Sequence, residues 1–134
     1  MVFLVKVIDS SVLVALFFPE DKFHGKARRL IEQNANESIL LSELILFETL
    51  TVLNYYIGVE RTKIAYDNLL NDKQLVFTNF SDAEKREILA VFFSQAGKKL
   101  SVQDCSVIYQ ARRHKIEPLT FDGGINLALG AKIN

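Results

Sequence analysis

The chain has 134 residues, of which 49% are hydrophobic, so it has the size of one compact domain and enough apolar material to fill a core. Sixteen basic and sixteen acidic residues give a formal net charge of zero, which excludes a global field that attracts nucleic acid from a distance. The single cysteine, Cys105, excludes an internal disulfide and a cysteine-based zinc site. We expect a single domain over residues 1–134.

The first half of the sequence predicts two strands, each followed by helices. In chain order, the expected elements are a strand at 2–8, helices at 10–18 and 20–33, a strand at 38–41, and helices at 43–57 and 61–71. Pro19 stops the first helix, and Gly58 ends the third one, which Ser42 can cap.

The second half predicts further alternation of strands and helices. In chain order, we expect a strand at 74–77, a helix from Ser81 to near Gln95, a helix from Ser101 to near Lys115, a strand at 116–120, the turn Asp122-Gly123-Gly124, and a weak strand at 131–133. Serine precedes an acid by three residues at the start of both helices, which is capping-box spacing. Strands that alternate with helices predict an α/β fold with a parallel sheet covered on both faces.

The start of the chain is apolar, but Lys6 and Asp9 follow too early for the apolar core of a signal peptide. No stretch approaches the roughly 18 to 20 apolar residues that a membrane span needs. We therefore expect a cytoplasmic protein with no membrane partner.

Two aspartates follow predicted strands, at the edge where α/β proteins place their functional sites. Asp9 comes directly after the strand at 2–8, and Asp122 lies just beyond the strand at 116–120. Thr120 lies two residues before Asp122, so its hydroxyl can share one side of the chain with that carboxylate and orient it. A helix cap at Asp9 or Ser11 and an Asx turn at Asp122 explain these residues equally well when each is taken alone.

Glu48 is placed unusually for a carboxylate. The residues three and four positions away along its helix are mainly apolar: Leu44, Ile45, Thr51 and Val52. No lysine or arginine occurs in residues 43–57 to pair with it, and burying an unpaired charge is costly. A metal ion would compensate the charge, and a position at the rim that reaches water is the open alternative.

Asp104 stands at the third position after Ser101, where an acid completes a capping box. Its helix turns Cys105, Ile108 and Ala111 toward the expected core, so its carboxylate can also point across the sheet edge toward Asp9. Both interpretations remain open.

Four carboxylates in one place repel each other unless a cation neutralises them. Oxygen ligands without a histidine and cysteine cluster select a hard ion, Mg²⁺ or Mn²⁺. The chemistry that such a site supports is hydrolysis of a phosphodiester, in which metal lowers the pKa of a bound water and stabilises charge on the phosphate.

Four segments of the sequence resemble motifs of the PIN-domain family, and within it the compact VapC-like toxins of toxin–antitoxin pairs. They are VIDSSVLVAL at residues 7–16, LILFETL at 44–50, LSVQDC at 100–105 and LTFD at 119–122. The resemblance extends over essentially the whole length and implies a three-layer α/β/α sandwich with a central parallel sheet. It also implies a Mg²⁺- or Mn²⁺-dependent endoribonuclease that acts on structured RNA.

The resemblance assigns residue roles and partners as well. Metal ligation is carried onto Asp9, Glu48, Asp104 and Asp122, and support onto Ser11 and Thr120. Such proteins are commonly homodimers, and the toxins are inhibited by a small antitoxin protein. Family members often have a further acid two residues beyond the last one, where this chain has Gly124, and this leaves the number of metals open.

Four other functions are alternatives to this one. A dehalogenase-type phosphatase needs a second Asp where this chain has Ser11, and a histidine-based ribonuclease would use His24 and His114, which fit surface and helix-end positions. A PIN-like fold can also bind RNA or protein without cleaving it. An RNA-processing nuclease without an antitoxin is a further alternative, and a chelator or metal titration separates the metal enzyme from the histidine enzyme and the binding module.

Overall fold

A four-stranded parallel sheet lies at the centre of the protein. A computed structural model describes residues 5–97 and 99–130 of the chain. The strands are β1 (Val5–Ile8), β2 (Ser38–Ser42), β3 (Leu75–Thr78) and β4 (Pro118–Leu119), in the spatial order β3-β2-β1-β4. Every neighbouring pair is parallel, with Val7 opposite Leu40 on one side and opposite Pro118 on the other.

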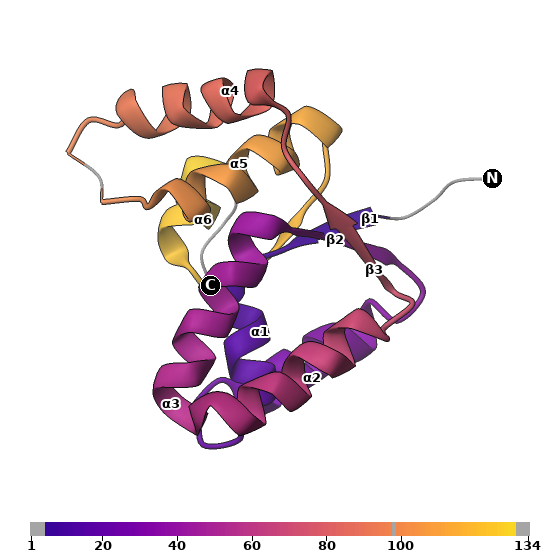
Figure 1. Cartoon of the computed structure of the whole chain (residues 1–134). Helices are drawn as coiled ribbons and strands as arrows, with labels where there is room; N and C mark the ends of the chain where they lie inside the picture. Colours follow the sequence, from indigo (N-terminus) through magenta and orange to yellow (C-terminus); the bar gives the residue numbers. More distant parts are fainter. Residues whose placement is uncertain (1–4, 98, 131–134) are drawn as a thin grey trace.

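Helices cover both faces of this sheet. They are α1 (Ser10–Phe17), α2 (His24–Gln33), α3 (Glu43–Leu70), α4 (Asp82–Phe93), α5 (Val102–His114) and α6 (Gly123–Ala128). Figure 1 shows α4, α5 and α6 on one side of the sheet, and α1, α2 and most of α3 on the other. The predicted three-layer α/β/α sandwich with a central parallel sheet is confirmed. None of the described helices combines the length and the apolar character that crossing a membrane requires.

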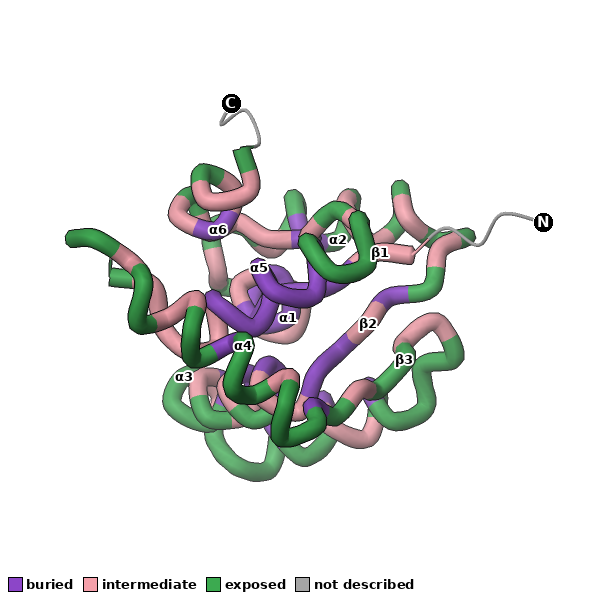
Figure 2. The backbone as a smooth tube through the Cα atoms, turned by 90° about the horizontal axis from the view of Figure 1, so that it is seen from above, coloured by how far each residue is buried: buried purple, intermediate pink, exposed green. Residues whose placement is uncertain are grey.

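The core lies between the sheet and the helices next to it. Val7 and Ile8 of β1, Leu41 of β2, and Val107 and Ile108 of α5 are all at most 1% exposed. Buried residues concentrate along α1, α5 and β2, whereas α4 is mostly exposed (Figure 2). The carboxyl end of β1 and the start of α1 therefore lie in the buried part of the fold.

One helix prediction needs correction, and two others are confirmed. The helix expected at 20–33 begins only at His24, because the Asp21 carboxylate accepts a hydrogen bond from the Phe23 backbone N–H, 2.8 Å away, and holds a turn before it. The helices expected at 43–57 and 61–71 are both present within α3, where they meet at a kink at Gly58, whose φ of 83° and ψ of 166° are not helical. The helix that Ser42 caps therefore ends at Gly58, as the sequence predicted.

Near the end of the described chain, the strand expected at 116–120 is only Pro118–Leu119. Pro118 has no N–H, and the pairing relies on β1 donating from Val7 and Asp9 to the carbonyls of Glu117 and Leu119. The turn expected at Asp122 begins a short helix, α6, which the sequence analysis missed. The strand expected at 131–133 lies outside the described residues.

Candidate metal centre

The order of the strands creates a crevice at one end of the sheet. The chain runs from β1 to β2 on one side, and later returns to place β4 on the other side of β1. Helices that follow β1 and β4 therefore diverge to opposite faces, and the crevice opens at the carboxyl ends of these two strands. Asp9 follows β1, and Thr120 and Asp122 follow β4, so both segments lie at this opening.

Asp9 is the most buried acid of the site, with 2% of its surface exposed. It caps α1, and its Oδ2 accepts hydrogen bonds from the Ser11 hydroxyl at 2.8 Å and the Thr120 hydroxyl at 2.9 Å. Its Oδ1 is buried and has no hydrogen-bond partner among the described residues. A buried carboxylate oxygen is rarely left without a partner, so this atom requires an explanation.

Two hydroxyl groups link Asp9 to the segment after β4. The Ser11 hydroxyl donates to Asp9 and accepts from the Phe121 backbone N–H at 3.0 Å. The Thr120 hydroxyl donates to Asp9 and accepts from the Asp122 backbone N–H at 2.9 Å. Thr120 therefore orients the carboxylate of Asp9 and the backbone of Asp122, whereas the sequence suggested that it orients the Asp122 carboxylate.

Glu48 extends from the first part of α3 and is only partly buried. Its Oε1 accepts a hydrogen bond from the Ser10 hydroxyl, so α1 and α3 are joined at the site. Burial raises the pKa of Glu48, and the Ser10 hydrogen bond offsets part of this effect. The negative charges of the three aspartates raise this pKa further; they belong to Asp9, Asp104 and Asp122.

Asp104 completes the capping box of α5. Its Oδ2 accepts from the Ser101 backbone N–H, and its own N–H donates to the Ser101 hydroxyl, both at 3.0 Å. Burial raises the pKa of the Asp104 carboxyl, the backbone hydrogen bond from Ser101 opposes this, and the charges of Asp122 and Asp9 add to the increase. Asp104 therefore has the capping role that the sequence indicated, and it also lies within electrostatic reach of the other acids.

Asp122 caps α6 through Oδ1, which accepts from the backbone N–H groups of Gly124 at 2.7 Å and Ile125 at 3.2 Å. Gly124 has little space around it, because a Cβ atom there would lie 3.0 Å from both Asp122 Oδ1 and a side-chain carbon of Leu100. Gly124, where the resemblance would place a further acid, is thus closely packed against Asp122 itself.

The four predicted acids therefore lie within electrostatic reach of one another at one end of the sheet. Within residues 5–97 and 99–130, however, no three acidic, histidine or cysteine side chains are already close enough to hold one ion. Carboxylates without a cation repel each other, which favours such an open arrangement. The donor set consists of oxygen atoms, and the unpartnered Oδ1 of Asp9 is the kind of atom that a hard divalent cation binds.

The two histidines have the ordinary positions that the sequence suggested. A ring nitrogen of His24, Nδ1, lies 2.7 Å from the Ala15 carbonyl oxygen and ties the start of α2 to α1. His114 is exposed at the last residue of α5. Neither position points to acid–base chemistry.

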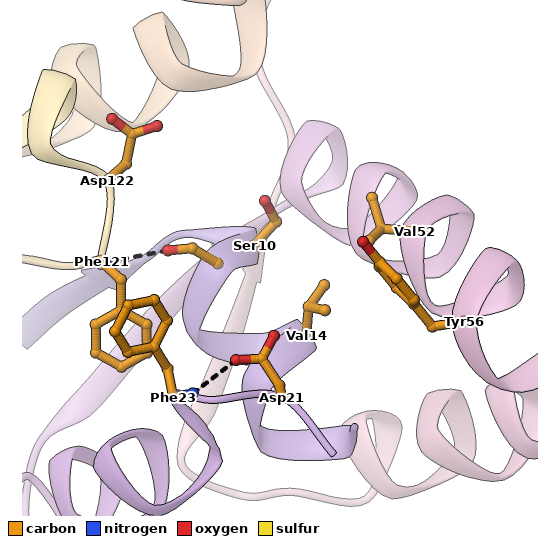
Figure 3. Close-up of a pocket in the computed structure, with 9 residues that line it drawn as sticks. Ser10, Val14, Asp21, Phe23, Val52, Tyr56, Phe121 and Asp122 are labelled. Atoms are coloured by element: carbon orange, nitrogen blue, oxygen red, sulfur yellow. Dashed lines mark hydrogen bonds between the residues drawn. The ribbon is translucent and has the colours of Figure 1, made fainter. Parts of the chain in front are cut away.

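The structure also brings residues to the site that the sequence did not indicate. Ser10 contacts Glu48, next to Ser11, which the resemblance had named as a support residue and which contacts Asp9. Beside the acids lies a pocket of about 310 Å³ whose walls include Phe23, Tyr56 and Phe121. Figure 3 shows Phe23 and Phe121 on one side of this pocket, and Val52 and Tyr56 on the other. Aromatic residues far apart in sequence gave no signal that they share one pocket.

Comparison with known proteins places this architecture in a family. The sequence model of the PIN domain matches residues 6–128. A search of curated proteins found no match. Among solved structures, VapC20 of Mycobacterium tuberculosis, described as a toxin that cleaves the sarcin-ricin loop, superposes with a TM-score of 0.82 at 21% identity, covering 92% of this chain and 94% of that one.

Two further structures share the fold. VapBC2 from Rickettsia felis, solved with a DNA fragment from its promoter, has a TM-score of 0.70 at 14% identity, with 98% of each chain covered. PAE2754 from Pyrobaculum aerophilum has a TM-score of 0.60 at 20% identity, covering 98% of this chain and 91% of that one. The family match over residues 6–128, the parallel sheet and the acids beyond its strands agree, and the chain is a member of the PIN-domain family.

Proposed function

We propose that this protein is a Mg²⁺- or Mn²⁺-dependent endoribonuclease. The observation that carries the proposal is Asp9, a nearly fully buried carboxylate with one oxygen held by two hydroxyl groups and the other without a partner among the described residues. A buried charge that is only half satisfied is costly in an isolated fold, and a divalent cation at Oδ1 would compensate it.

The residues that would hold the ion are Asp9, Glu48, Asp104 and Asp122. When bound, the ion would supply a Lewis acid that neutralises charge on the phosphate and makes water nucleophilic near neutral pH. The protein's own contribution is to fix the ligands: Ser11 and Thr120 hold Asp9, and Ser10 holds Glu48. The carboxylate of Asp9 is thereby kept in place.

The open arrangement of the acids fits this proposal. Glu48 and Asp104 each have a pKa raised by burial and by neighbouring negative charge, so positive charge at this rim would relieve both groups. We expect the partly buried Glu48 to turn toward Asp9 when the ion binds, because its side chain is the longest of the four and has a single hydrogen bond.

The resemblance to VapC-like proteins supports further parts of the proposal. We propose an RNA substrate, a small antitoxin protein as partner, a homodimer, and a cytoplasmic location for residues 1–134 acting as one PIN-like domain. VapC20 is described as a toxin, and VapBC2 is a complex solved with promoter DNA, which supports a toxin role. A reading frame for a small DNA-binding protein beside the gene is the simplest observation in favour of an antitoxin.

The experiment that tests the proposal is cleavage of purified total RNA with Mn²⁺, with Mg²⁺ and with a chelator. We expect cleavage only with metal, and its complete loss in Asp9→Asn, which keeps the size of the side chain and the oxygen that caps α1. Asp82→Asn, at an exposed position in the first turn of α4, is the matched control and should cleave normally. Circular dichroism checks that Asp9→Asn is folded, and undiminished cleavage in that variant would refute the assignment.

A second candidate is a PIN-like module that binds RNA or protein without cleaving it. The observation that favours it is the absence, among the described residues, of three ligands already assembled for one ion. A titration with Mn²⁺ separates the two candidates. The metal enzyme should bind the ion at Asp9, and a module without a metal centre should not.

A further inference from the structure

The pocket beside the acids is lined by aromatic rings from three separate parts of the chain. Phe23 precedes α2, Tyr56 lies in α3, and Phe121 follows β4. The volume of the pocket, about 310 Å³, is at the lower end of the roughly 300 to 1,000 Å³ that is common for sites binding small molecules. A single flat ring system is the size of ligand that such a pocket accommodates.

These rings are held in place before any ligand binds. The centroids of Phe23 and Phe121 are 5.1 Å apart, and the Asp21 carboxylate and the Ser11 hydroxyl accept hydrogen bonds from their backbone N–H groups (Figure 3). On the opposite wall, Tyr56 stacks on Phe18 with the ring centroids 4.9 Å apart and an angle of 18° between the planes. Phe23 and Tyr56 nevertheless remain 37% and 53% exposed, so their surfaces are available to a ligand.

Positive charges lie near the aromatic rings at the rim of the pocket, and negative charges lie in its lining. The ammonium group of Lys22 lies 5.0 Å from the ring centroid of Phe23, and that of Lys26 lies 5.7 Å from the centroid of Phe121. Both lysines are exposed, whereas the lining includes the carboxylates of Asp21 and Asp122. A phosphate would be repelled inside the pocket and attracted at its rim, and a neutral aromatic group fits the inside.

The pocket is continuous with the candidate metal centre. Ser10, which contacts Glu48, and Ser11, which contacts Asp9, are part of its lining together with Asp122. A ligand held between the aromatic walls therefore lies directly beside the acids.

We propose that this pocket binds one unpaired base of an RNA strand, stacked on the aromatic rings, with the neighbouring phosphates between the two lysines and the acids. The proposal rests on the proposed ribonuclease function and adds to it a subsite for one base, which this chain builds from Phe23, Tyr56 and Phe121. Aromatic platforms with adjacent cations are how proteins hold single strands, and stacking tolerates different bases because each has a π face.

The test compares how tightly the protein binds an RNA strand with all of its bases and one that lacks some of them. The probes are a fluorescein-labelled 12-nucleotide single-stranded RNA and the same strand with four central nucleotides that lack bases, both titrated with EDTA present so that nothing is cleaved. We expect the wild-type chain to bind the complete strand about tenfold more tightly, a typical effect for one stacked base. Phe23→Ala and Tyr56→Ala should each reduce that preference, and Phe23→Tyr should restore it.

Phe93→Ala is the matched control, because Phe93 is 77% exposed at the end of α4 and its substitution should leave the preference unchanged. The chain has no tryptophan, so Phe23→Trp adds a single reporter whose fluorescence a stacked base should quench. Adenosine should quench it, and ribose 5-phosphate, which has no base, should not.

Failure of this proposal and failure of the ribonuclease function give different results. Equal binding of the two strands by the wild-type chain, or an unchanged preference in both alanine variants, overturns the base pocket even if RNA is cleaved with Mn²⁺. If those variants instead lose a protein partner and keep RNA binding, the pocket belongs to that protein and the proposal is overturned. A base preference in a chain that never cleaves RNA supports the pocket and rejects the ribonuclease.

Discussion

Three of the four acids each use one carboxylate oxygen to begin a helix. Asp9 caps α1, Asp104 completes the capping box of α5, and Asp122 caps α6. Each of these carboxylates has a second oxygen that accepts no hydrogen bond from the described residues. Capping and metal binding are thus compatible in one side chain, which explains why the sequence pattern alone could not decide between them.

Glu48 differs from the aspartates because it caps no helix, and its pKa, like that of Asp104, is raised by burial. In the metal-free protein, the folded state therefore holds the Glu48 proton more tightly than the unfolded state does. Stability from this group is complete below its ordinary pKa of 4.5 and is lost as the pH rises through the raised value. Above that window, ionised Glu48 destabilises the fold.

We predict that Glu48→Gln makes the metal-free protein more stable than the wild type at neutral pH, and that the difference vanishes at pH 4. The amide oxygen of glutamine can still accept the hydrogen bond from Ser10, so only the charge is removed. Urea unfolding in EDTA at several pH values measures the difference. Glu60→Gln, an exposed position on the same helix, is the control and should show no such gain. A Glu48→Gln variant that is less stable than the wild type at neutral pH would contradict the prediction.

Among single residues, the sequence pointed to the acids and to Ser11 and Thr120, but not to Ser10 or Tyr56. Asp9 and Asp122 were recognisable because strands end beside them, and Glu48 because its helix face is apolar. Ser10 and Tyr56 were not, because a hydroxyl or a ring on a helix has no pattern that says which distant residue it meets. Their roles depend on how α1 packs against α3.

At the scale of elements, the two capping boxes offer a matched comparison. Ser81 and Glu84 begin α4, and Ser101 and Asp104 begin α5, with the same pair of reciprocal hydrogen bonds. Only the second box contains a candidate metal ligand.

We predict that Ser81→Ala and Ser101→Ala each lower the free energy of unfolding by about 1 kcal/mol, the usual contribution of an N-cap. Only Ser101→Ala should also weaken Mn²⁺ binding, by about tenfold, because it removes a partner that fixes a ligand. Urea unfolding in EDTA measures the first effect and calorimetric titration with Mn²⁺ the second. Equal Mn²⁺ affinity in the two variants would show that Asp104 is a cap and not a ligand.

Most elements could be predicted from the sequence, and the errors have local causes. Gly58 correctly marked the boundary between the two helices of α3, and Leu53 and Ala65, on either side of the kink, pack in the same apolar cluster. The short helix α6 was missed because two glycines follow Asp122, and glycine disfavours helix by about 1 kcal/mol per residue. The carboxylate cap and the burial of Ile125 outweigh that preference.

At the scale of the whole molecule, the strand order turns a sequence pattern into a site. The alternation of strands and helices was enough to predict a parallel sheet with acids at its carboxyl end. The sequence did not reveal how far apart those acids stay, because that distance depends on the angles at which α1, α3 and α5 pack. The spacing of the four acids, whose negative charges repel one another, is therefore set by the complete fold and not by any one element.

Metal binding should change the stability of the whole molecule. An ion that binds the folded chain and not the unfolded one stabilises it by mass action, by about 2.7 kcal/mol at a concentration 100 times the dissociation constant. We expect Mn²⁺ to stabilise the wild-type chain in this way, as measured by urea unfolding with and without EDTA. Asp82→Asn should respond equally, and Asp9→Asn should lose the response because it removes the charge next to the unpartnered oxygen. If Asp9→Asn is stabilised as strongly as the wild type, the ion binds elsewhere, and the crevice between β1 and β4 is not its site.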